Sequence, residues 1–248
     1  EGNYNKYDRT VPQTRWPCNS CKGYGCKKCN DTGQLYPDSV QSLVAEPFID
    51  AASCKEDLFH GMGREDIDAA MLGSGRPFVI ELRMPRVRNL DLSTIENQIN
   101  KKNESRIKVN NLKFVERSRV PELKNTVCDK TYRVDVSVFG EDSIESLKKG
   151  AQRLTGTVIE QRTPMRVSHR RADLVRPRFI NSIDVTSFEG NMAELIIRAQ
   201  HGTYIRELVS GDEGRTNPSF SSLVDAKCKV EVLDVLNLHL DAKEEKND

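Results

Sequence analysis

INSIDVTSFEGNMAELIIRAQ, residues 180–200, contains two runs in which apolar and polar residues alternate. A short polar connection, EGN at 189–191, separates the two runs and includes one glycine. Alternation of this kind is typical of β-strands with one buried face, and a short glycine-containing connection favours a hairpin. Because a hairpin pairs its strands in opposite directions, the segment predicts an antiparallel sheet in this part of the chain.

Similar strand signals recur along the sequence, separated by segments with helical patterns. We expect strands at 77–84, 106–116, 131–139 and 227–238. We expect a helix from an N-cap at Asp38 through Leu43, and another that a Ser93–Glu96 capping box opens and that continues past Ile99. A third helix is expected over 143–154. The sequence therefore predicts an α+β fold on a mixed, mainly antiparallel sheet.

The composition is that of a globular protein outside the membrane. The 248 residues include 38 Lys+Arg and 37 Asp+Glu, and 37% of them are hydrophobic. The apolar runs are far shorter than the roughly 20 residues that span a bilayer, and we find no signal peptide, so a cytoplasmic location is the default expectation. The net charge of +1 gives no overall reason to expect a polyanionic partner.

Four of the seven cysteines form the pattern C-x2-C-x4-C-x2-C: Cys18, Cys21, Cys26 and Cys29. Two C-x2-C pairs can converge on one ion, and the glycines at 23 and 25 permit the tight turn between them, so the pattern favours a closed, structural zinc site. Two disulfides are the alternative, which a reducing compartment disfavours. Cys54, Cys128 and Cys228 are expected to be buried thiols.

Composition also suggests where the chain divides. Residues 1–37 are polar and rich in Gly, Pro and Cys, so we expect a zinc module whose folding energy comes from the metal. Residues 38–240 are expected to form one larger domain. Residues 241–248 are expected to be a frayed, charged tail.

Two glycine-containing segments of the larger domain could present functional side chains. Residues 60–78, expected to be a loop, carry Arg64, Glu65, Asp66 and Asp68. Residues 200–216 are expected to join a strand to a helix that begins near Tyr204. The alternatives are an ordinary capped surface turn and an amphipathic helix with a solvated arginine.

A third segment, 161–179, is strongly basic. It carries six arginines and His169 against a single acid, Asp173. Guanidinium groups bind phosphates through two oxygens, and unopposed arginines repel one another without a partner. The segment therefore favours an RNA-phosphate contact over a merely solvated loop.

The strings GREDIDAAMLGSGRPF, CDKTYRV, IEQRTPMRVSHRRADLVRPR and GTYIREL, together with the cysteine pattern, resemble the archaeal and eukaryotic tRNA pseudouridine synthases of the "Pus-ten" type. The resemblance covers about residues 12–240 in matching order. It implies a pseudouridine-synthase fold, with two subdomains on a bent antiparallel sheet flanking a cleft. It also implies isomerisation of uridine to pseudouridine at positions 54, 55 or both in the TΨC loop of tRNA, with no organic cofactor.

The resemblance assigns roles to individual residues. Asp66 corresponds to the catalytic aspartate, and Arg206 to the basic residue that pairs with it above Leu208. Tyr132 corresponds to the aromatic residue that stacks on the target base, beside Lys130. We also expect substrate contacts from Arg64 and from the basic segment, with residues Arg162, Arg166, His169, Arg170 and Arg171.

The reaction needs an ionised carboxylate, which can attack C1′ or remove a ribose proton to give a glycal. The sequence does not distinguish between these two mechanisms.

Two features depart from the family pattern. Ala70 replaces an arginine, and the N-terminal RNA-binding domain of the family is not recognised here, so we expect either that the sequence is a fragment or that the domain is supplied separately.

Two other classes of protein share parts of the pattern. The segment CNSCKGYG fits one unit of the DnaJ-type chaperone repeat, which those chaperones carry four times. A non-catalytic, zinc-containing RNA-binding protein would keep the cysteines and the arginines, but it has no need of Asp66, Tyr132 and Arg206.

Overall fold

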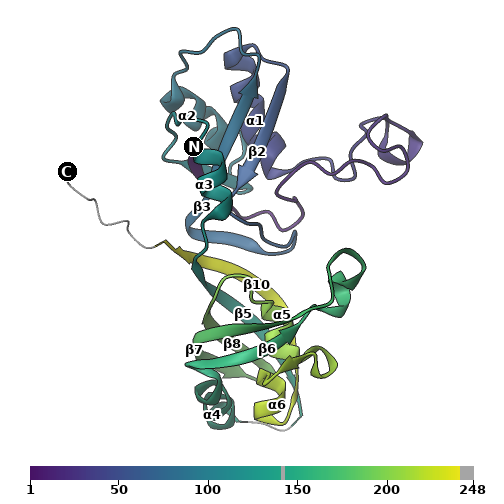
Figure 1. Ribbon diagram of the computed structural model, residues 1–248, viewed down its shortest axis with the longest axis vertical. Coiled ribbons are helices and arrows are strands. Elements are labelled where there is room, and N and C mark those ends of the chain that lie inside the picture. Colours follow the sequence, from purple (N-terminus) through teal and green to yellow (C-terminus); the bar gives the residue numbers. More distant parts are fainter. Residues whose placement is uncertain (141–142, 241–248) are drawn as a thin grey trace, which may run out of the picture. The chain divides into compact units, whose positions relative to one another are not determined.

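The computed structural model describes the backbone of residues 1–140 and 143–240, and every side chain among them except that of Arg170. The chain forms two compact units, Glu1–Thr126 (unit 1) and Val127–Asp248 (unit 2) (Figure 1). The charged tail predicted at 241–248 lies outside the described residues. No described helix combines the length and the apolar character required to cross a membrane.

Unit 1 is a small antiparallel sheet with helices. Its strands are β1 (Gly2–Lys6), β2 (Glu56–Gly61), β3 (Ala70–Arg83) and β4 (Ile107–Asn110). Its helices are α1 (Val40–Ala52), α2 (Leu92–Lys102), α3 (Arg119–Asn125) and the 3-10 turn η1 (Lys27–Cys29). Strand β1 lies between β3 and β4 and is antiparallel to both, and β2 pairs with β3. Tyr4, Phe59 and Phe78 pack together in the core, where the rings of Phe59 and Phe78 are stacked 5.1 Å apart.

Unit 2 is a larger antiparallel sheet. Its strands are β5 (Asp129–Phe139), β6 (Thr157–Arg162), β7 (Val175–Glu189), β8 (Met192–Ala199), β9 (Thr216–Asn217) and β10 (Lys227–His239). Their order across the sheet is β10-β5-β8-β7-β6-β9. Its helices are α4 (Ile144–Leu154), α5 (Ile205–Ser210) and α6 (Phe220–Val224), with the 3-10 turns η2 (Met165–Arg170) and η3 (Asp212–Gly214). Helix α4 packs on β7 and α6, and α5 packs on β10.

The predicted hairpin at 180–200 is confirmed. Glu189 pairs with Met192, so Gly190 and Asn191 form a two-residue turn, and Gly190 has a φ of 60°. Every strand pairing described within either unit is antiparallel, as expected. The predicted helix at 143–154 is also confirmed, with Ser143 as its N-cap.

Several predicted boundaries were wrong. Helix α1 is capped by Ser39 rather than Asp38 and continues to Ala52 through Pro47, and α2 is capped by Asp91 rather than by a Ser93–Glu96 box. The second half of the predicted loop at 60–78 is strand, because β3 begins at Ala70. Four strands, β1, β2, β6 and β9, were not predicted, because their apolar alternation is weak or short.

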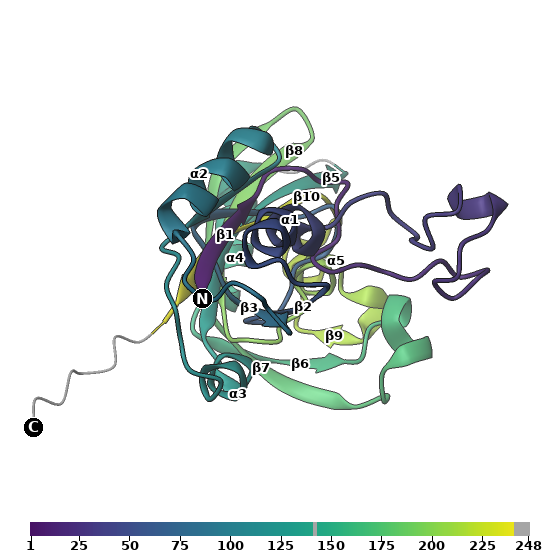
Figure 2. The same ribbon diagram turned by 90° about the horizontal axis from the view of Figure 1, so that it is seen from above.

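The structure divides the N-terminal part differently from the predicted zinc module of residues 1–37. Its first strand, β1, is a central strand of the unit 1 sheet, and both Asn5 and Lys6 are buried there. The four cysteines of the C-x2-C-x4-C-x2-C pattern lie in a long connecting segment between β1 and α1. We call this segment, residues 16–36, the cysteine module (Figure 2).

Candidate active site and metal centre

The loop at residues 62–69, called the Asp66 loop, connects β2 to β3 in unit 1. A buried arginine on β3 fixes its first half: Arg76 Nη1 donates a hydrogen bond to the Met62 carbonyl at 2.8 Å. Arg76 Nε also lies 2.8 Å from Glu65 Oε2, and both side chains are 1% exposed. The Tyr4 hydroxyl lies 3.0 Å from each Glu65 oxygen. The Glu65 carboxylate is therefore engaged in holding the loop together.

A buried lysine fixes the second half of the same loop. Lys6 is fully buried, and its Nζ donates to the carbonyl oxygens of Val11 at 3.2 Å, Asp66 at 3.3 Å and Ile67 at 2.6 Å. Burial lowers the pKa of Lys6, while nearby carboxylates, Glu65 first among them, oppose that shift. The ammonium group thus fixes two consecutive carbonyl groups of the loop, those of Asp66 and Ile67.

The three acids of the loop have different surroundings. Glu65 is buried, Asp66 is half-buried, and Asp68 is exposed, with its carbonyl accepting a hydrogen bond from Arg9 at 3.0 Å. Asp66 thus combines a fixed backbone with a side chain that is partly open to solvent. This is the arrangement that a catalytic carboxylate requires.

Two neighbours of Asp66 were also singled out from the sequence. Arg64 is exposed, and its guanidinium carbon lies 5.6 Å from the centre of the Trp16 ring, in a cation–π contact. Ala70, which replaces the arginine of the family pattern, is the buried first residue of β3.

The remaining predicted catalytic residues, Tyr132 and Arg206, belong to unit 2, as do Lys130 and Leu208, which were predicted to contact the substrate. Lys130 and Tyr132 lie on β5, where Tyr132 is paired with Val235 of β10 and Ile197 of β8. Arg206 and Leu208 lie on α5, which packs on β10. Arg206 Nη1 donates to the Val230 carbonyl at 3.3 Å, and Leu208 is fully buried. Within unit 2, therefore, β5 and α5 both contact β10, β5 by strand pairing and α5 by packing.

The basic segment at 161–179 is not a simple loop, and the expectation that its arginines are locally unopposed was wrong for two of them. Arg162, at the end of β6, binds Asp173 through both Nε and Nη2, the shortest contact being 2.6 Å. Arg166 Nε donates to Glu207 Oε1 of α5 at 2.7 Å, and its guanidinium lies over the Tyr204 ring. Glu207 is 41 residues from Arg166 in sequence, so no local pattern indicated the pair.

Among the described side chains, no carboxylate lies within ion-pair distance of the other basic residues of the segment. Arg171 and His169 are exposed, and Arg176 donates to Thr163 and to the Leu174 carbonyl. Burial lowers the pKa of Arg178, and the charge of the adjacent Arg176 adds to this effect. The segment thus keeps an excess of positive charge. The side chain of Arg170, also a predicted contact, lies outside the described part.

The four predicted metal ligands come together as expected. The Sγ atoms of Cys18, Cys21, Cys26 and Cys29 all lie within 4.8 Å of one another, and the shortest separation, Cys26 to Cys29, is 3.7 Å. A tetrahedral zinc ion with Zn–S bonds of about 2.3 Å separates its sulfurs by about 3.8 Å. All four thiols are free, so the alternative of two disulfides is wrong.

Backbone groups of the module favour thiolates. The N–H groups of Cys26 and Gly33 donate to Cys29 Sγ at 3.2 and 3.3 Å, and Gly25 donates to Cys21 Sγ at 3.2 Å. Hydrogen bonds from the backbone of Cys21 and Ser20 lower the pKa of the Cys18 thiol to about 6. These residues therefore fit a divalent metal held by four sulfurs. Cys54, Cys128 and Cys228 are buried, as predicted.

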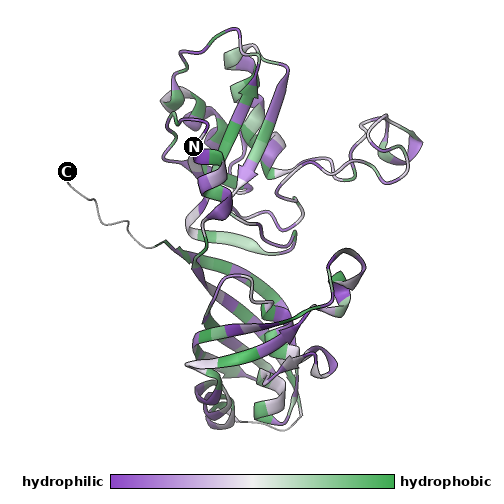
Figure 3. Cartoon of the chain, in the orientation of Figure 1, coloured by the Kyte–Doolittle hydropathy of each residue, from purple (hydrophilic) through white to green (hydrophobic). Residues whose placement is uncertain are grey.

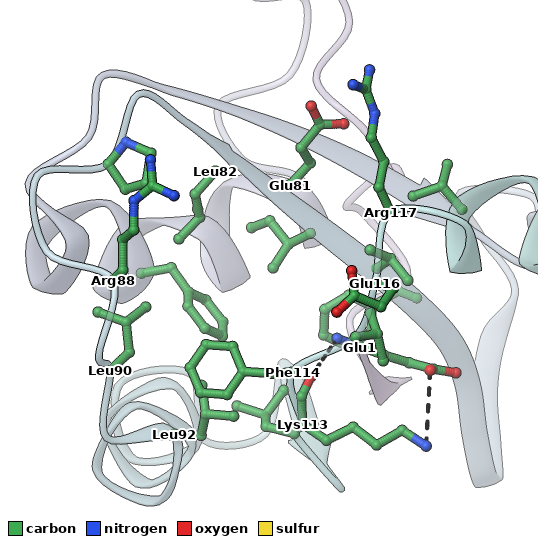
Figure 4. Close-up of a pocket in the computed structure, with 18 of the residues that line it drawn as sticks. Glu1, Glu81, Leu82, Arg88, Leu90, Leu92, Lys113, Phe114, Glu116 and Arg117 are labelled. Carbon is green, nitrogen blue, oxygen red and sulfur yellow. Dashed lines mark hydrogen bonds and ion pairs between the residues drawn. The ribbon is translucent and has the colours of Figure 1, made fainter.

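The module has little hydrophobic core of its own. Figure 3 shows mostly hydrophilic residues along it, and its base is closed by an edge-to-face contact of Trp16 with Tyr36, whose ring centres are 5.7 Å apart. A separate cavity of about 500 Å³ lies elsewhere in unit 1, and its lining is more apolar than the cysteine module (Figure 4). Leu82, Leu92 and Phe114 are among its lining residues, and it contains none of the predicted site residues.

Comparison of the sequence with known proteins identifies a family. Residues 1–239 match the family described as Pus10, C-terminal. The chain belongs to this family. It is 47% identical over 239 residues to the tRNA pseudouridine synthase Pus10 of Methanothrix thermoacetophila. The aligned region covers 96% of this chain and 52% of that protein. The Pus10 of Methanocaldococcus jannaschii is 46% identical over 239 residues, with the same coverage. The chain thus spans about half the length of these Pus10 relatives.

The fold has a counterpart among solved structures. A chain in the crystal structure of a Cbf5–Nop10–Gar1 complex aligns with a TM-score of 0.53 at 13% identity, covering 95% of this chain and 48% of that one. This likeness concerns the fold, and it agrees with the predicted α+β, mainly antiparallel architecture. The predicted resemblance to the Pus10 family is confirmed.

Proposed function

We propose that this chain is the catalytic part of a tRNA pseudouridine synthase that isomerises uridine in the TΨC loop, at position 54, 55 or both. The observation that supports this most is the match of residues 1–239 to the Pus10 C-terminal family, whose curated relatives are named tRNA pseudouridine synthases. The Asp66 loop supports the same proposal, because its buried contacts leave Asp66 as the acid that is both fixed and partly open to solvent.

In the proposed reaction Asp66 acts on the ribose of the target uridine. The bond from C1′ to N1 breaks, the uracil turns, and a new bond forms from C1′ to C5; the hydrogen on C5 leaves as a proton and N1 gains a proton, so the formula is unchanged. Asp66 either forms a bond to C1′ or removes a ribose proton to give a glycal, and either role requires the ionised carboxylate. Lys6 and Arg76 would contribute by holding the backbone around Asp66, so that little reorganisation accompanies the reaction.

The unit 2 residues are proposed to act on the same uridine. A uridine within a folded arm must be flipped out, and an aromatic ring such as that of Tyr132 can hold the base while it is detached. Arg206 is proposed to pair with Asp66, with Leu208 packed beneath it and Lys130 beside Tyr132. A positive charge beside a carboxylate favours its ionised form and fixes its orientation.

The basic segment is proposed to bind the phosphate backbone of the T-arm, together with Arg64. Its contacts would come from Arg162, Arg166, His169, Arg170 and Arg171. Because Asp173 and Glu207 already pair with two of these arginines, phosphate must either replace those carboxylates or bind beside them.

Three further proposals complete the assignment. The four cysteines are proposed to hold a structural zinc ion, which would fix the fold of the module and take no part in the reaction. A separate N-terminal RNA-binding domain is proposed to assist in binding tRNA. A cytoplasmic location is proposed, as for an enzyme that acts on soluble tRNA.

Tritium release tests the function directly. Uridine labelled at C5 loses its label to water when pseudouridine forms, so the parent should release tritium from a transcribed tRNA and Asp66→Ala should release none. Asp66→Ala should still bind the tRNA within a few-fold of the parent, because phosphate contacts supply most of the affinity. Asp68→Ala is the matched control, since it removes an exposed carboxylate from the same loop. If the parent binds tRNA but releases no label, the non-catalytic RNA-binding alternative replaces this proposal.

A further inference from the structure

The tip of the cysteine module presents an aromatic side chain to solvent. Tyr24 is 94% exposed, more than any other large hydrophobic side chain in the described part of the protein. It stands between Gly23 and Gly25, whose φ angles are 106° and 90°. These are left-handed conformations that favour glycine, and they place Tyr24 on a tight turn.

The backbone at Tyr24 is anchored to a metal ligand. The Tyr24 N–H donates to the Cys21 carbonyl at 3.1 Å, and the next N–H, of Gly25, donates to Cys21 Sγ at 3.2 Å. A Cβ at Gly25 would lie 2.9 Å from the Asp31 carbonyl oxygen, so the turn is also closely packed from behind. The position of the Tyr24 backbone therefore depends on the position of Cys21, one of the four proposed metal ligands.

Three basic residues lie within four positions of this aromatic residue in the sequence. Lys22, Lys27 and Lys28 are exposed, and no described carboxylate lies within ion-pair distance of them. Asp31 is the one acid between residues 18 and 33. Four thiolates around a divalent cation carry a net charge of −2, so the metal core itself does not attract phosphate. Any attraction for a polyanion must come from the three lysines.

We propose that the tip of the cysteine module is an RNA-binding surface, in which Tyr24 stacks on an unpaired base of the tRNA substrate and the lysines contact its phosphates. An exposed aromatic ring among basic groups is the usual means of binding single-stranded nucleic acid. A protein partner fits less well, because lysines are depleted from the centres of protein–protein interfaces. This inference rests on the proposed function, since it takes the RNA substrate from there.

The base of the module connects this surface to the Asp66 loop. Trp16, at the start of the module, packs under Arg64, which is two residues before Asp66. Gln13 Nε2, just ahead of the module, donates to the Gly63 carbonyl at 2.9 Å. One RNA molecule bound at the Asp66 loop would therefore lie next to the base of the module, and we expect it to extend from there to the tip.

Binding of the whole chain to transcribed tRNA, measured over a range of salt concentrations, tests the proposal. Tyr24→Ala should raise Kd by roughly 5- to 100-fold, the usual effect of removing a stacked aromatic ring, whereas Tyr24→Phe should stay within about 2-fold of the parent. Tyr24→Ala should not change the slope of log affinity against log salt, because stacking releases no counterions. Replacement of Lys22, Lys27 and Lys28 together by Gln should make that slope shallower.

Phe114→Ala is the matched control. Phe114 is another aromatic residue of unit 1, 64% exposed, and it lies at the cavity of Figure 4 rather than on the module. Its loss should leave Kd within about 2-fold of the parent. An unchanged Kd for Tyr24→Ala, or an equal loss for Phe114→Ala, would overturn the proposal.

Removal of the metal separates a stacking role from a merely structural one. A chelator should weaken tRNA binding by the parent, and the chelated parent and chelated Tyr24→Ala should then have the same Kd, because the ring has lost its anchor. If Tyr24→Ala weakens the chelated protein as strongly as the loaded one, the anchoring role of the metal is wrong. Failure of the proposed function is distinguishable, because it would appear as a parent that binds tRNA and releases no tritium.

Discussion

Replacing Arg76 with Met should strongly destabilise unit 1, because the buried Arg76 side chain holds the first half of the Asp66 loop in place. The guanidinium is 1% exposed, and it is both paired with the buried Glu65 carboxylate and hydrogen-bonded to the Met62 carbonyl. Removing one partner of a buried ion pair typically costs about 3–5 kcal/mol, since the other charge is left buried without compensation. The orphaned Met62 carbonyl adds about 1–3 kcal/mol. We therefore expect a loss of about 4 kcal/mol or more.

Urea unfolding measures this loss conveniently. Trp16 is the single tryptophan of the chain and lies in unit 1, so its fluorescence follows that unit. Arg88→Met is the matched control: Arg88 is an exposed arginine of unit 1, and its replacement should cost less than about 0.5 kcal/mol.

A second variant tests the reason for the loss. Glu65→Gln combined with Arg76→Met removes both charges, so it should be less destabilising than the sum of the two single variants by at least 1 kcal/mol. The reasoning would be refuted by a cost below about 1 kcal/mol for Arg76→Met, or by additive costs in the double variant.

Three other predictions follow from the same structure. Gly33→Ala should weaken metal retention, measured by competition with a chromogenic chelator, because its φ is 70° and a Cβ would collide with the Gly23 carbonyl oxygen. Lys6→Met should lower the unfolding free energy of unit 1 by about 2–4 kcal/mol and reduce the rate of tritium release, because three backbone carbonyls lose their donor; unchanged turnover would show that the lysine does not position Asp66. Hydrogen bonding from Arg162 lowers the pKa of Asp173, so this ion pair is retained at neutral pH and lost as pH falls through the lowered pKa; an NMR titration should place the midpoint of Asp173 below the ordinary value of an aspartate and show it rising in Arg162→Gln.

The sequence predicted best where one local pattern determines the structure. The alternation at 180–200 specified the β7–β8 hairpin, and Ser143 specified the start of α4. The cysteine spacing likewise predicted the four converging thiols. In each case a few adjacent residues contain all of the information.

The sequence predicted poorly where polar residues are buried. Strand β1 was missed because Asn5 and Lys6 look like surface residues, and their burial is stabilised by partners 60 or more residues away: Asp66, Ile67 and Gly73. The pairing of Arg166 with Glu207 was missed for the same reason. No signal within β1 itself could have revealed the contact of Lys6 with the Asp66 loop.

The placement of β1 affects the order in which unit 1 can be assembled during synthesis. Lys6 pairs with Ile107, and 101 residues separate them in the chain. At roughly 5–20 residues per second, a ribosome needs about 5–20 seconds to make that length. Until then β1 can pair with β3 alone, and its other edge has no strand beside it. The carbonyl groups that bind Lys6 and the strand β3 are all made before β4, so the contacts that fix the Asp66 loop can form while that edge of β1 is still open.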